Sequence, residues 1–250
     1  MITYKSKEEI NAMQEGGKIL SDVLWKVIEK VKPGISEIEL DSIAYQLIKK
    51  SGAEPAFMRV KGYKHTICTS TNDVVVHGIP GKYILKEGDI IGIDCGVYFK
   101  GLNTDMSETV GVGKINPQLE KFLQVGKLAL EMAVAEAHLG NRVGHISKTI
   151  QEIVEGSSYS VVHNLIGHGV GKELHEDPEI PGILFDNLKS TPILKNGMTL
   201  AIEVIYNIGD PQVEYALNDG WTIKTKDKSM SAVFERSVAV GQYEPIILTP

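Results

Sequence analysis

Three carboxylic acids occur in segments whose apolar neighbours predict buried β-strands, and a fourth lies at hairpin distance from one of them. Asp94 directly follows Ile-Ile-Gly-Ile, and Glu203 lies inside Leu-Ala-Ile-Glu-Val-Ile. Asp105 comes eleven residues after Asp94, which suits two paired strands of a hairpin, and Glu235 follows Val-Phe. A single acid at such a place is more often a loop or turn residue. The four acids therefore need a second observation before they indicate a site.

An internal repeat relates these acids in pairs. The twelve residues that end at Asp94 align with the twelve that end at Glu203, and both contain Ile-Leu-Lys, a glycine and an isoleucine at matching places. That offset is 109 residues, whereas Asp105 aligns with Glu235 at an offset of 130. The 21 additional residues of the second half contain the turn signal Asn218-Asp219-Gly220, which predicts a small extra hairpin.

The repeat has a chemical consequence. Two related halves that pack face to face would bring the four carboxylates together, and burial would raise the cost of keeping them charged. A pair of divalent cations removes that cost. The sequence therefore predicts a site for two metal ions.

Three histidines lie in glycine-rich or turn-forming segments. His168 is flanked by glycines in Gly-His-Gly-Val-Gly, His175 precedes Glu-Asp-Pro, and His77 ends a β-type run before Gly-Ile-Pro. A lone histidine is usually structural, but flanking glycines leave an imidazole accessible, as a metal ligand requires. His77 suits an acid–base group beside the metals. The chain matches neither a P-loop, nor a zincin helix, nor a Gly-x-Ser-x-Gly elbow.

The elements that must position these groups follow one order twice, two helices and then strands. Apolar periodicity, with cap signals at Ser36 and at Asn116-Pro117, predicts helices over 7–32, 36–51, 116–140 and 146–155. Short β-type runs predict strands over 65–71, 74–76, 89–94 and 109–112, and strands again dominate from residue 160 onward.

Composition limits the class of protein. The 250 residues are 42% hydrophobic and carry a net charge of −6, with no basic stripe, so no nucleic-acid partner is expected. No stretch is apolar enough to predict a signal peptide or a membrane span. Two cysteines, Cys68 and Cys95, are expected to be reduced thiols. We expect a cytoplasmic protein.

Five motifs together resemble a known family, the type I methionine aminopeptidases. They are Asn-Asp-Val-Val-Val-His77-Gly-Ile-Pro, the Asp94/Asp105 pair, Gly-His168-Gly-Val-Gly with His175-Glu-x-Pro, Gly-Met before Glu203, and Asp219-Gly-Trp221-Thr with Ser-Ala before Glu235. The resemblance covers nearly the whole chain. It implies an α+β pita-bread fold, shared with creatinase and proline-specific peptidases, with a curved antiparallel sheet and outer helices. The expected organisation is one domain, 1–250, with pseudo-symmetric halves of about 1–115 and 116–250.

The resemblance also implies a set of metal ligands. Asp94 would bind one metal and Asp105 and Glu235 would bridge both, while His168 and Glu203 would complete the second site. One imidazole and four carboxylates suit Mn²⁺, Fe²⁺ or Co²⁺ at least as well as Zn²⁺.

Further roles follow from the same resemblance. Water activated by the two metals would attack the first peptide bond, with Glu203 moving the proton. His175 would hydrogen-bond the developing oxyanion and His77 the scissile amide nitrogen. The substrate's first side chain would enter a pocket formed by three further residues, Tyr63, Cys68 and Trp221.

The resemblance predicts removal of the initiator methionine from nascent chains and peptides with a small second residue. The chain departs from the family pattern at Leu174, Val204, Val233 and Arg236, which leave every expected ligand in place but bear on methionine specificity. Alternatives are an aminopeptidase with a different first-residue preference, a non-catalytic peptide-binding module, or a creatinase-type enzyme without metal. The expected partners are polypeptide N-termini. The protein is expected to be a monomer, and a ribosome contact stays open.

Overall fold

The computed structural model describes residues 2–185, 187–216 and 219–250. Four α-helices and two short 3₁₀ helices are present in this part of the chain: α1 (Lys7–Ile28), α2 (Glu37–Lys50), α3 (Pro117–Ala135), α4 (Val143–Gly156), η1 (Phe57–Arg59) and η2 (Leu188–Ser190). The strands are β1 (Glu54–Pro55), β2 (Ile67–Thr71), β3 (Val74–Val76), β4 (Ile90–Phe99), β5 (Leu102–Gly111), β6 (Ser160–Val161), β7 (Ile166–Gly169), β8 (Glu176–Pro181), β9 (Thr199–Asn207), β10 (Val213–Tyr215), β11 (Ile223–Thr225), β12 (Ser231–Ala239) and β13 (Ile246–Ile247).

Local sequence signals explain where the helices begin. Ser36 donates its backbone N–H to Glu39 Oε2 at 2.9 Å, and Asn116 Oδ1 accepts from Leu119 N at 2.9 Å ahead of Pro117. Both predicted starts are confirmed. Helix α1 ends at Ile28, earlier than predicted, because Lys30 N and Val31 N donate to carbonyls three residues back, Val27 O and Ile28 O, so the chain tightens into turns before Pro33.

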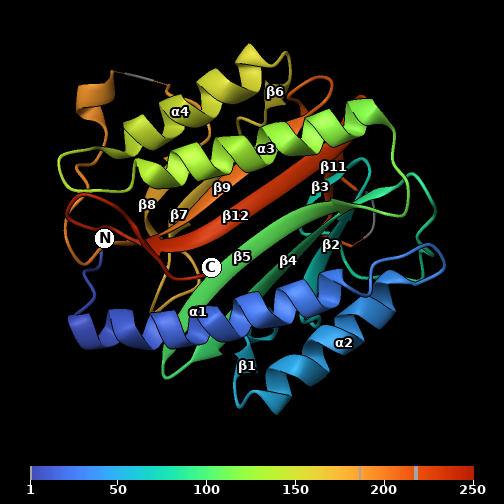
Figure 1. Cartoon of the computed structure of the whole chain (residues 1–250), viewed down its shortest axis with the longest axis horizontal. Coiled ribbons are helices and arrows are strands. Elements are labelled where there is room, and N and C mark those ends of the chain that lie inside the picture. The colour runs from blue at the N-terminus through green and yellow to red at the C-terminus, as the bar shows by residue number, and fades with distance from the viewer. Residues whose placement is uncertain (1, 186, 217–218) are drawn as a thin grey trace.

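One ten-stranded sheet runs through the molecule. Its main path is β1-β4-β5-β12-β9-β7-β8, with β2 on β4, β6 on β9 and β13 on β12, and the pairings are antiparallel. Hairpin β4–β5 belongs to the N-terminal part of the chain and the pair β9–β12 to the C-terminal part. They meet at the β5–β12 pairing in the middle of the sheet (Figure 1).

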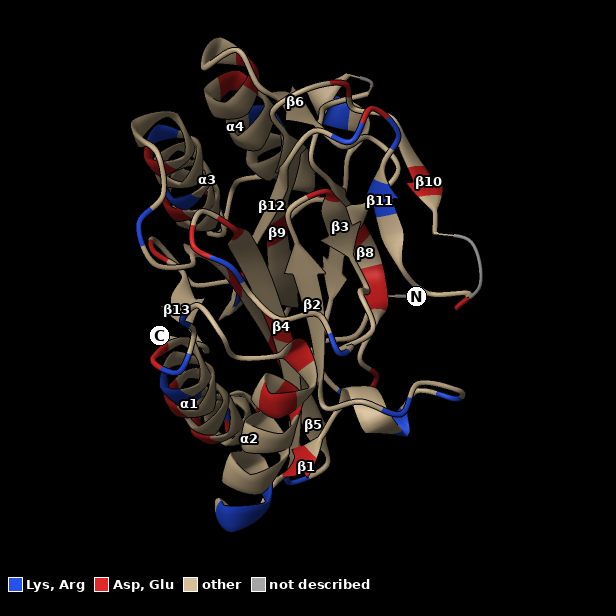
Figure 2. Ribbon diagram, turned by 90° about the vertical axis from the view of Figure 1, so that its right-hand side faces the viewer, with Lys and Arg blue, Asp and Glu red and all other residues tan. Residues whose placement is uncertain are grey.

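All four α-helices cover one face of this sheet. Figure 2 shows them to one side of the central strands, with β3, β8, β10 and β11 to the other. Helices α1 and α2 pack on β4 and β5 through one apolar cluster, and α3 and α4 pack on β9 and β12 through another. Since strand side chains alternate in direction, every second residue of the central strands is left for the opposite face.

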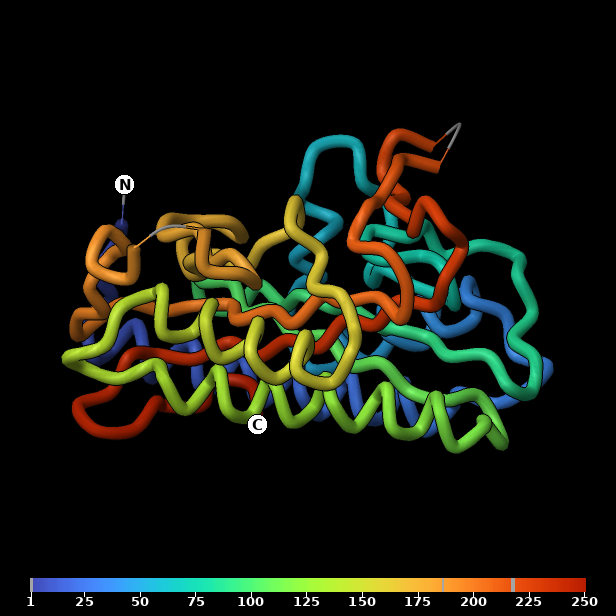
Figure 3. Tube along the Cα trace, turned by 90° about the horizontal axis from the view of Figure 1, so that it is seen from above, coloured from blue at the N-terminus to red at the C-terminus, as the bar shows by residue number. Residues whose placement is uncertain are grey.

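The predicted extra hairpin is present between β9 and β12. Strands β10 and β11 pair antiparallel, and β11 also pairs with β3 from the N-terminal part of the chain. The predicted turn is described only in part, because Asn218 lies outside the described residues. Figure 3 shows this hairpin rising on the face opposite the helices, beside the loop that precedes β2.

Two predicted strands were too short. Strand β4 continues to Phe99 and β5 begins at Leu102, so Asp94 lies inside a strand and not at its end. The hairpin turns at Lys100 and Gly101, which both have positive φ. Among the described residues, no helix combines the length and the apolar character that crossing a bilayer requires.

Candidate metal centre and substrate pocket

The five predicted metal ligands lie on five neighbouring strands. In sheet order these are β4, β5, β12, β9 and β7, which carry Asp94, Asp105, Glu235, Glu203 and His168 respectively. The residues that alternate with them, such as Ile93 on β4 and Ile202 on β9, pack under the helices. The ligands therefore share the face of the sheet that the helices leave free.

Strand register brings these groups together. Asp94 is paired with Ser107 and Asp105 with Gly96, so the two aspartates are diagonal neighbours on one face. Glu203 lies directly opposite Glu235. Like charges in direct opposition destabilise a sheet, so this pair needs a compensating positive charge.

The donor set fits a divalent metal. One ligand atom each from Asp105, His168 and Glu235 lies within 4.8 Å of the others, and all three residues are buried. Within the described part of the chain, Asp94 Oδ1 and Glu235 Oε1 are buried oxygens without a hydrogen-bond partner. Buried carboxylate oxygens left unpaired are costly, and a cation would satisfy both.

Electrostatics lead to the same conclusion. Burial raises the pKa of Asp94 from 3.8 to about 7. Burial, followed by the charge of neighbouring carboxylates, raises the pKa values of Asp105, Glu203 and Glu235 well above their usual range. Without a cation, this cluster holds protons at neutral pH.

His168 is oriented as a ligand by a second contact. Its Nδ1 lies 2.8 Å from the carbonyl oxygen of Gly169, which can only accept a hydrogen bond, so Nδ1 carries the proton. The unprotonated Nε2 then faces Glu203 Oε1 at 3.5 Å. Burial, with the nearby His175, lowers the pKa of His168 to about 4 and keeps the ring neutral.

These pKa shifts predict how metal-free protein responds to pH. The folded pKa of Asp94 is about 7 against 3.8 for the free group, so the folded state binds more protons between these values. Ionisation of Asp94 therefore destabilises the metal-free folded state. This destabilisation is absent below pH 3.8, grows as the pH rises and is complete above about pH 7. The melting temperature gained by adding Mn²⁺ after chelation should therefore be larger near pH 8 than near pH 5. Equal gains at the two pH values would mean that the carboxylates stay ionised without metal.

Side-chain hydroxyls fix the strands that carry the two predicted bridging acids. Ser237 Oγ accepts from Asp105 N at 2.9 Å and donates to Asp105 O at 2.8 Å. Thr109 Oγ1 likewise accepts from Val233 N at 3.0 Å and donates to Val233 O at 2.7 Å. These bridges flank Glu235 and hold β5 against β12 on both sides of it.

Arg236, which departs from the family pattern, lies on the helix-covered face. Its guanidinium donates to the carbonyl oxygens of Glu235 and Ser107 at 2.7 and 3.2 Å and to Glu108 Oε2 at 2.9 Å. Glu108 also pairs with Lys127 at 3.0 Å. Arg236 therefore braces the backbone at the ligand without taking a place in the metal cluster.

His77 and His175 lie beside the cluster and are exposed. His77 has a φ of 56°, an uncommon conformation for a residue with a side chain. A Cβ on the following Gly78 would lie 1.9 Å from Thr69 O, so only glycine permits this turn. The protein around each ring lowers both pKa values despite the exposure, and the charge of His175 adds to the effect on His77.

An apolar pocket opens onto the carboxylates. It contains the three predicted pocket residues: Tyr63 packs edge-on against Trp221 at 5.2 Å and donates to Cys68 Sγ at 3.1 Å. Trp221 is positioned by Asp219, whose Oδ1 accepts from Trp221 N at 2.8 Å. Four further apolar residues line the pocket: Phe57, Val60, Val76 and Leu174. Val76 and Leu174 lie in or beside the motifs noted above, whereas no motif marked Phe57 or Val60.

Comparison with known proteins identifies the family. A model described as metallopeptidase family M24 matches residues 11–242. A methionine aminopeptidase of Clostridium perfringens is 43% identical over 100% of this chain and 99% of its own length. The methionine aminopeptidase 1 of Bacillus subtilis is 42% identical, with the same coverage of both chains. The chain belongs to the methionine aminopeptidases of metallopeptidase family M24.

Solved structures confirm the pita-bread fold. A methionine aminopeptidase from Thermotoga maritima superposes with a TM-score of 0.96 at 37% identity, covering 100% of this chain and 99% of that one. A prolidase from Pyrococcus furiosus has a TM-score of 0.80 at 25% identity and covers 99% of this chain but 65% of that one. Membership of a metallopeptidase family implies divalent metal ions, in agreement with the carboxylate and histidine cluster.

Proposed function

We propose that this protein removes the N-terminal methionine from nascent chains and peptides by hydrolysis that depends on two divalent metal ions. One observation carries the proposal: an apolar pocket ends directly at the five side chains expected to bind metal and has two histidines beside it. The donor set suits Mn²⁺, Fe²⁺, Co²⁺ or Zn²⁺. When bound, such ions lower the pKa of water and polarise a carbonyl oxygen.

The chain's own groups have distinct proposed tasks. Tyr63, Cys68 and Trp221 hold the thioether of the first residue, because a polarisable sulfur packs well against rings and a thiol. His77 hydrogen-bonds the scissile amide nitrogen, and His175 the oxygen on which charge develops. Glu203, whose Oε1 faces His168, can hold a proton at Oε2 because burial raises its pKa.

Specificity at the second residue tests this proposal. The backbone is tightly packed next to His77 and His168, since a Cβ on Gly78 would lie 1.9 Å from Thr69 O and one on Gly169 2.2 Å from Asp177 O, so we expect little room there for a second side chain. Met-Ala-Ser should therefore be cleaved far faster than Met-Leu-Ser, because a carbonyl misplaced by about 1 Å can cost on the order of 10²-fold in rate. The measurement is kcat/KM on Met-X-Ser peptides after chelation and again after metal is restored. Similar values for alanine and leucine would overturn the expected preference for a small second residue, and full activity after chelation would overturn the proposed metal-dependent hydrolysis.

A second candidate is an aminopeptidase of the same fold that prefers another first residue. Leu174 favours it, because this residue lines the pocket where the resemblance leads us to expect an aromatic ring. A smaller side chain leaves room for first residues broader than methionine. A preference for leucine or phenylalanine over methionine at the first position, on X-Ala-Ser peptides, would support this candidate.

We also propose that the two halves, about 1–115 and 116–250, act as one domain in one chain. Asp94 and Asp105 come from the first half, and His168, Glu203 and Glu235 from the second, so neither half would hold the metals alone. All five come from the same chain, so the proposed monomer would hold a complete site. Cys68 and Cys95 are buried and unpaired, which supports the reducing cytoplasm as its location.

A further inference from the structure

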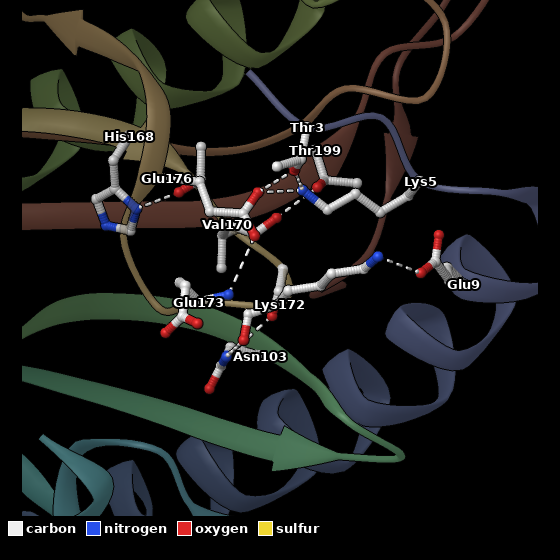
Figure 4. A network of polar contacts seen from close by, with 12 residues as sticks. Thr3, Lys5, Glu9, Asn103, His168, Val170, Lys172, Glu173, Glu176 and Thr199 are labelled. Carbon is white, nitrogen blue, oxygen red and sulfur yellow. Dashed lines mark hydrogen bonds and ion pairs between the residues drawn. The ribbon is translucent and has the colours of Figure 1, made fainter. Parts of the chain in front are cut away.

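A buried ion pair lies behind the turn that carries His175. The side chains of Lys5 and Glu176 form it, and their side-chain exposures are only 1% and 5%. Lys5 comes from the segment before α1, and Glu176 directly follows His175 at the start of β8 (Figure 4). The proposed chemistry uses neither residue.

The N-terminal segment is fixed to this place by several contacts. Lys5 N donates to Gly197 O at 2.7 Å, which ties its backbone to the loop before β9. Lys5 Nζ also donates to Thr3 Oγ1 at 2.6 Å, and the Thr3 hydroxyl donates to Glu176 Oε2. A Cβ on Gly171 would lie 2.1 Å from Lys5 Cε, so the lysine chain passes directly over the turn.

Glu176 connects the fixed N-terminal segment to the turn that carries His175. Its Oε2 accepts from Lys5 and Thr3, and its Oε1 accepts from Glu173 N at 3.0 Å. On the other side, Asn103 on β5 donates through N and Nδ2 to Gly171 O at 2.7 and 2.9 Å. The turn 170–176 is thus held from two sides, and it carries Leu174 and His175 into the pocket.

Stability alone does not account for a buried ammonium here. Lysine is rarely buried fully, and a buried ion pair is often no more stabilising than apolar residues of similar size. A better-supported role of a buried ion pair is to favour one conformation of the groups around it. The position of His175 has to be fixed in this way. Its ring centroid lies 4.4 Å from that of the expected ligand His168, and the turn between them is rich in glycine.

We propose that the Lys5–Glu176 pair is a positioning device that sets the place of His175 relative to the metal centre. Lys5 is a positioning residue and touches no substrate. The inference rests on the proposed function, because it assumes that His175 acts in turnover. The segment before α1, which carries Lys5, thereby helps to hold His175 in place.

A double-mutant cycle tests this proposal in the full-length, metal-loaded protein. Lys5→Met should lower kcat on Met-Ala-Ser by roughly 10–100-fold, the scale of a small misplacement, with KM changed by less than about threefold. In the His175→Ala background the same change should have little further effect, because the group that Lys5 positions is gone. Equal losses in both backgrounds, or unchanged kcat in Lys5→Met, would overturn the positioning role. Unchanged kcat in His175→Ala alone would instead contradict the proposed function.

Two further variants separate positioning from folding. Lys5→Met/Glu176→Gln removes both charges and so avoids an unpaired buried charge. It should melt closer to the unaltered protein than Lys5→Met does and still show lowered kcat. Full recovery of kcat together with stability would mean that the pair is structural only. Lys172→Met is the matched control, because Lys172 is an exposed lysine on the same turn that pairs with Glu9 of α1 at 3.3 Å, and kcat of this variant should not change.

Discussion

Replacing Asp105 by asparagine is expected to abolish metal binding and peptide hydrolysis while raising the stability of the metal-free protein. Asp105 is buried, and its pKa is raised first by burial and then by the charges of Asp94 and Glu203. A neutral amide of the same shape removes that repulsion. Loss of even an outer partner of a ligand costs about 10–100-fold in metal affinity, so a lost bridging ligand should cost more.

The measurements are metal titration, kcat on Met-Ala-Ser, and melting temperature with and without chelator. Glu235→Gln should behave in the same way, because Glu235 is the other predicted bridging acid. Glu37→Gln is the matched control, because Glu37 is also buried with a raised pKa but accepts from Thr71 and Gly81 and does not line the pocket. It should keep metal and activity. Unchanged metal affinity in Asp105→Asn would remove this residue from the ligand set.

The sequence singled out Asp94, Glu203 and Glu235 because each lies in or directly after an apolar run, where an acid is unusual. The repeat added Asp105, whereas the proposed ligand role of His168 came only from the resemblance. An acid such as Asp94 or Glu203 inside an apolar strand costs free energy unless something compensates it, and the repeat placed two acids in each half. Helix starts at Ser36 and Asn116 were equally local, since a cap needs only the next three residues. Both kinds of prediction depend on residues that are neighbours in sequence.

The lengths of β4 and β5 were harder to predict, because side chains on the two faces of the sheet have different surroundings. Strand β5 reads Leu-Asn-Thr-Asp-Met-Ser-Glu-Thr-Val-Gly, which has too few apolar residues to resemble a buried strand. One face of it carries Asp105 at the site, and the other buries Glu108, which Arg236 and Lys127 neutralise. These pairings come from β12 and α3, so the polar pattern makes sense only in the folded protein.

The pocket wall and the support of the site depend on long-range contacts. Phe57 lies on a short 3₁₀ helix and packs edge-on against Tyr63 at 6.3 Å, and Lys5 reaches Glu176 across 171 residues of sequence. Neither residue has an unusual local sequence. No periodicity or motif marks a residue whose role is set by a partner so far along the chain.

Replacing His77 by asparagine is expected to lower kcat by roughly 10²–10⁴-fold, the usual contribution of an acid–base group, without loss of metal. Asparagine is the appropriate substitution because His77 has a φ of 56°, and asparagine tolerates this left-handed conformation better than alanine does. The backbone turn at Gly78 should then be kept, and the change is confined to the imidazole.

His77 differs from His168 in its surroundings, which is why its loss should spare the metals. It is exposed beside the pocket and lies outside the buried group formed by Asp105, His168 and Glu235. Its pKa is lowered by burial of part of the ring and by the charge of His175, so the ring is neutral at pH 7 and can donate one hydrogen bond to a substrate amide. Metal stoichiometry and kcat should be measured together, with His163→Asn as the control because that histidine is also exposed and lies outside the pocket lining. Loss of metal from His77→Asn would make His77 a ligand, and unchanged kcat would remove it from the reaction.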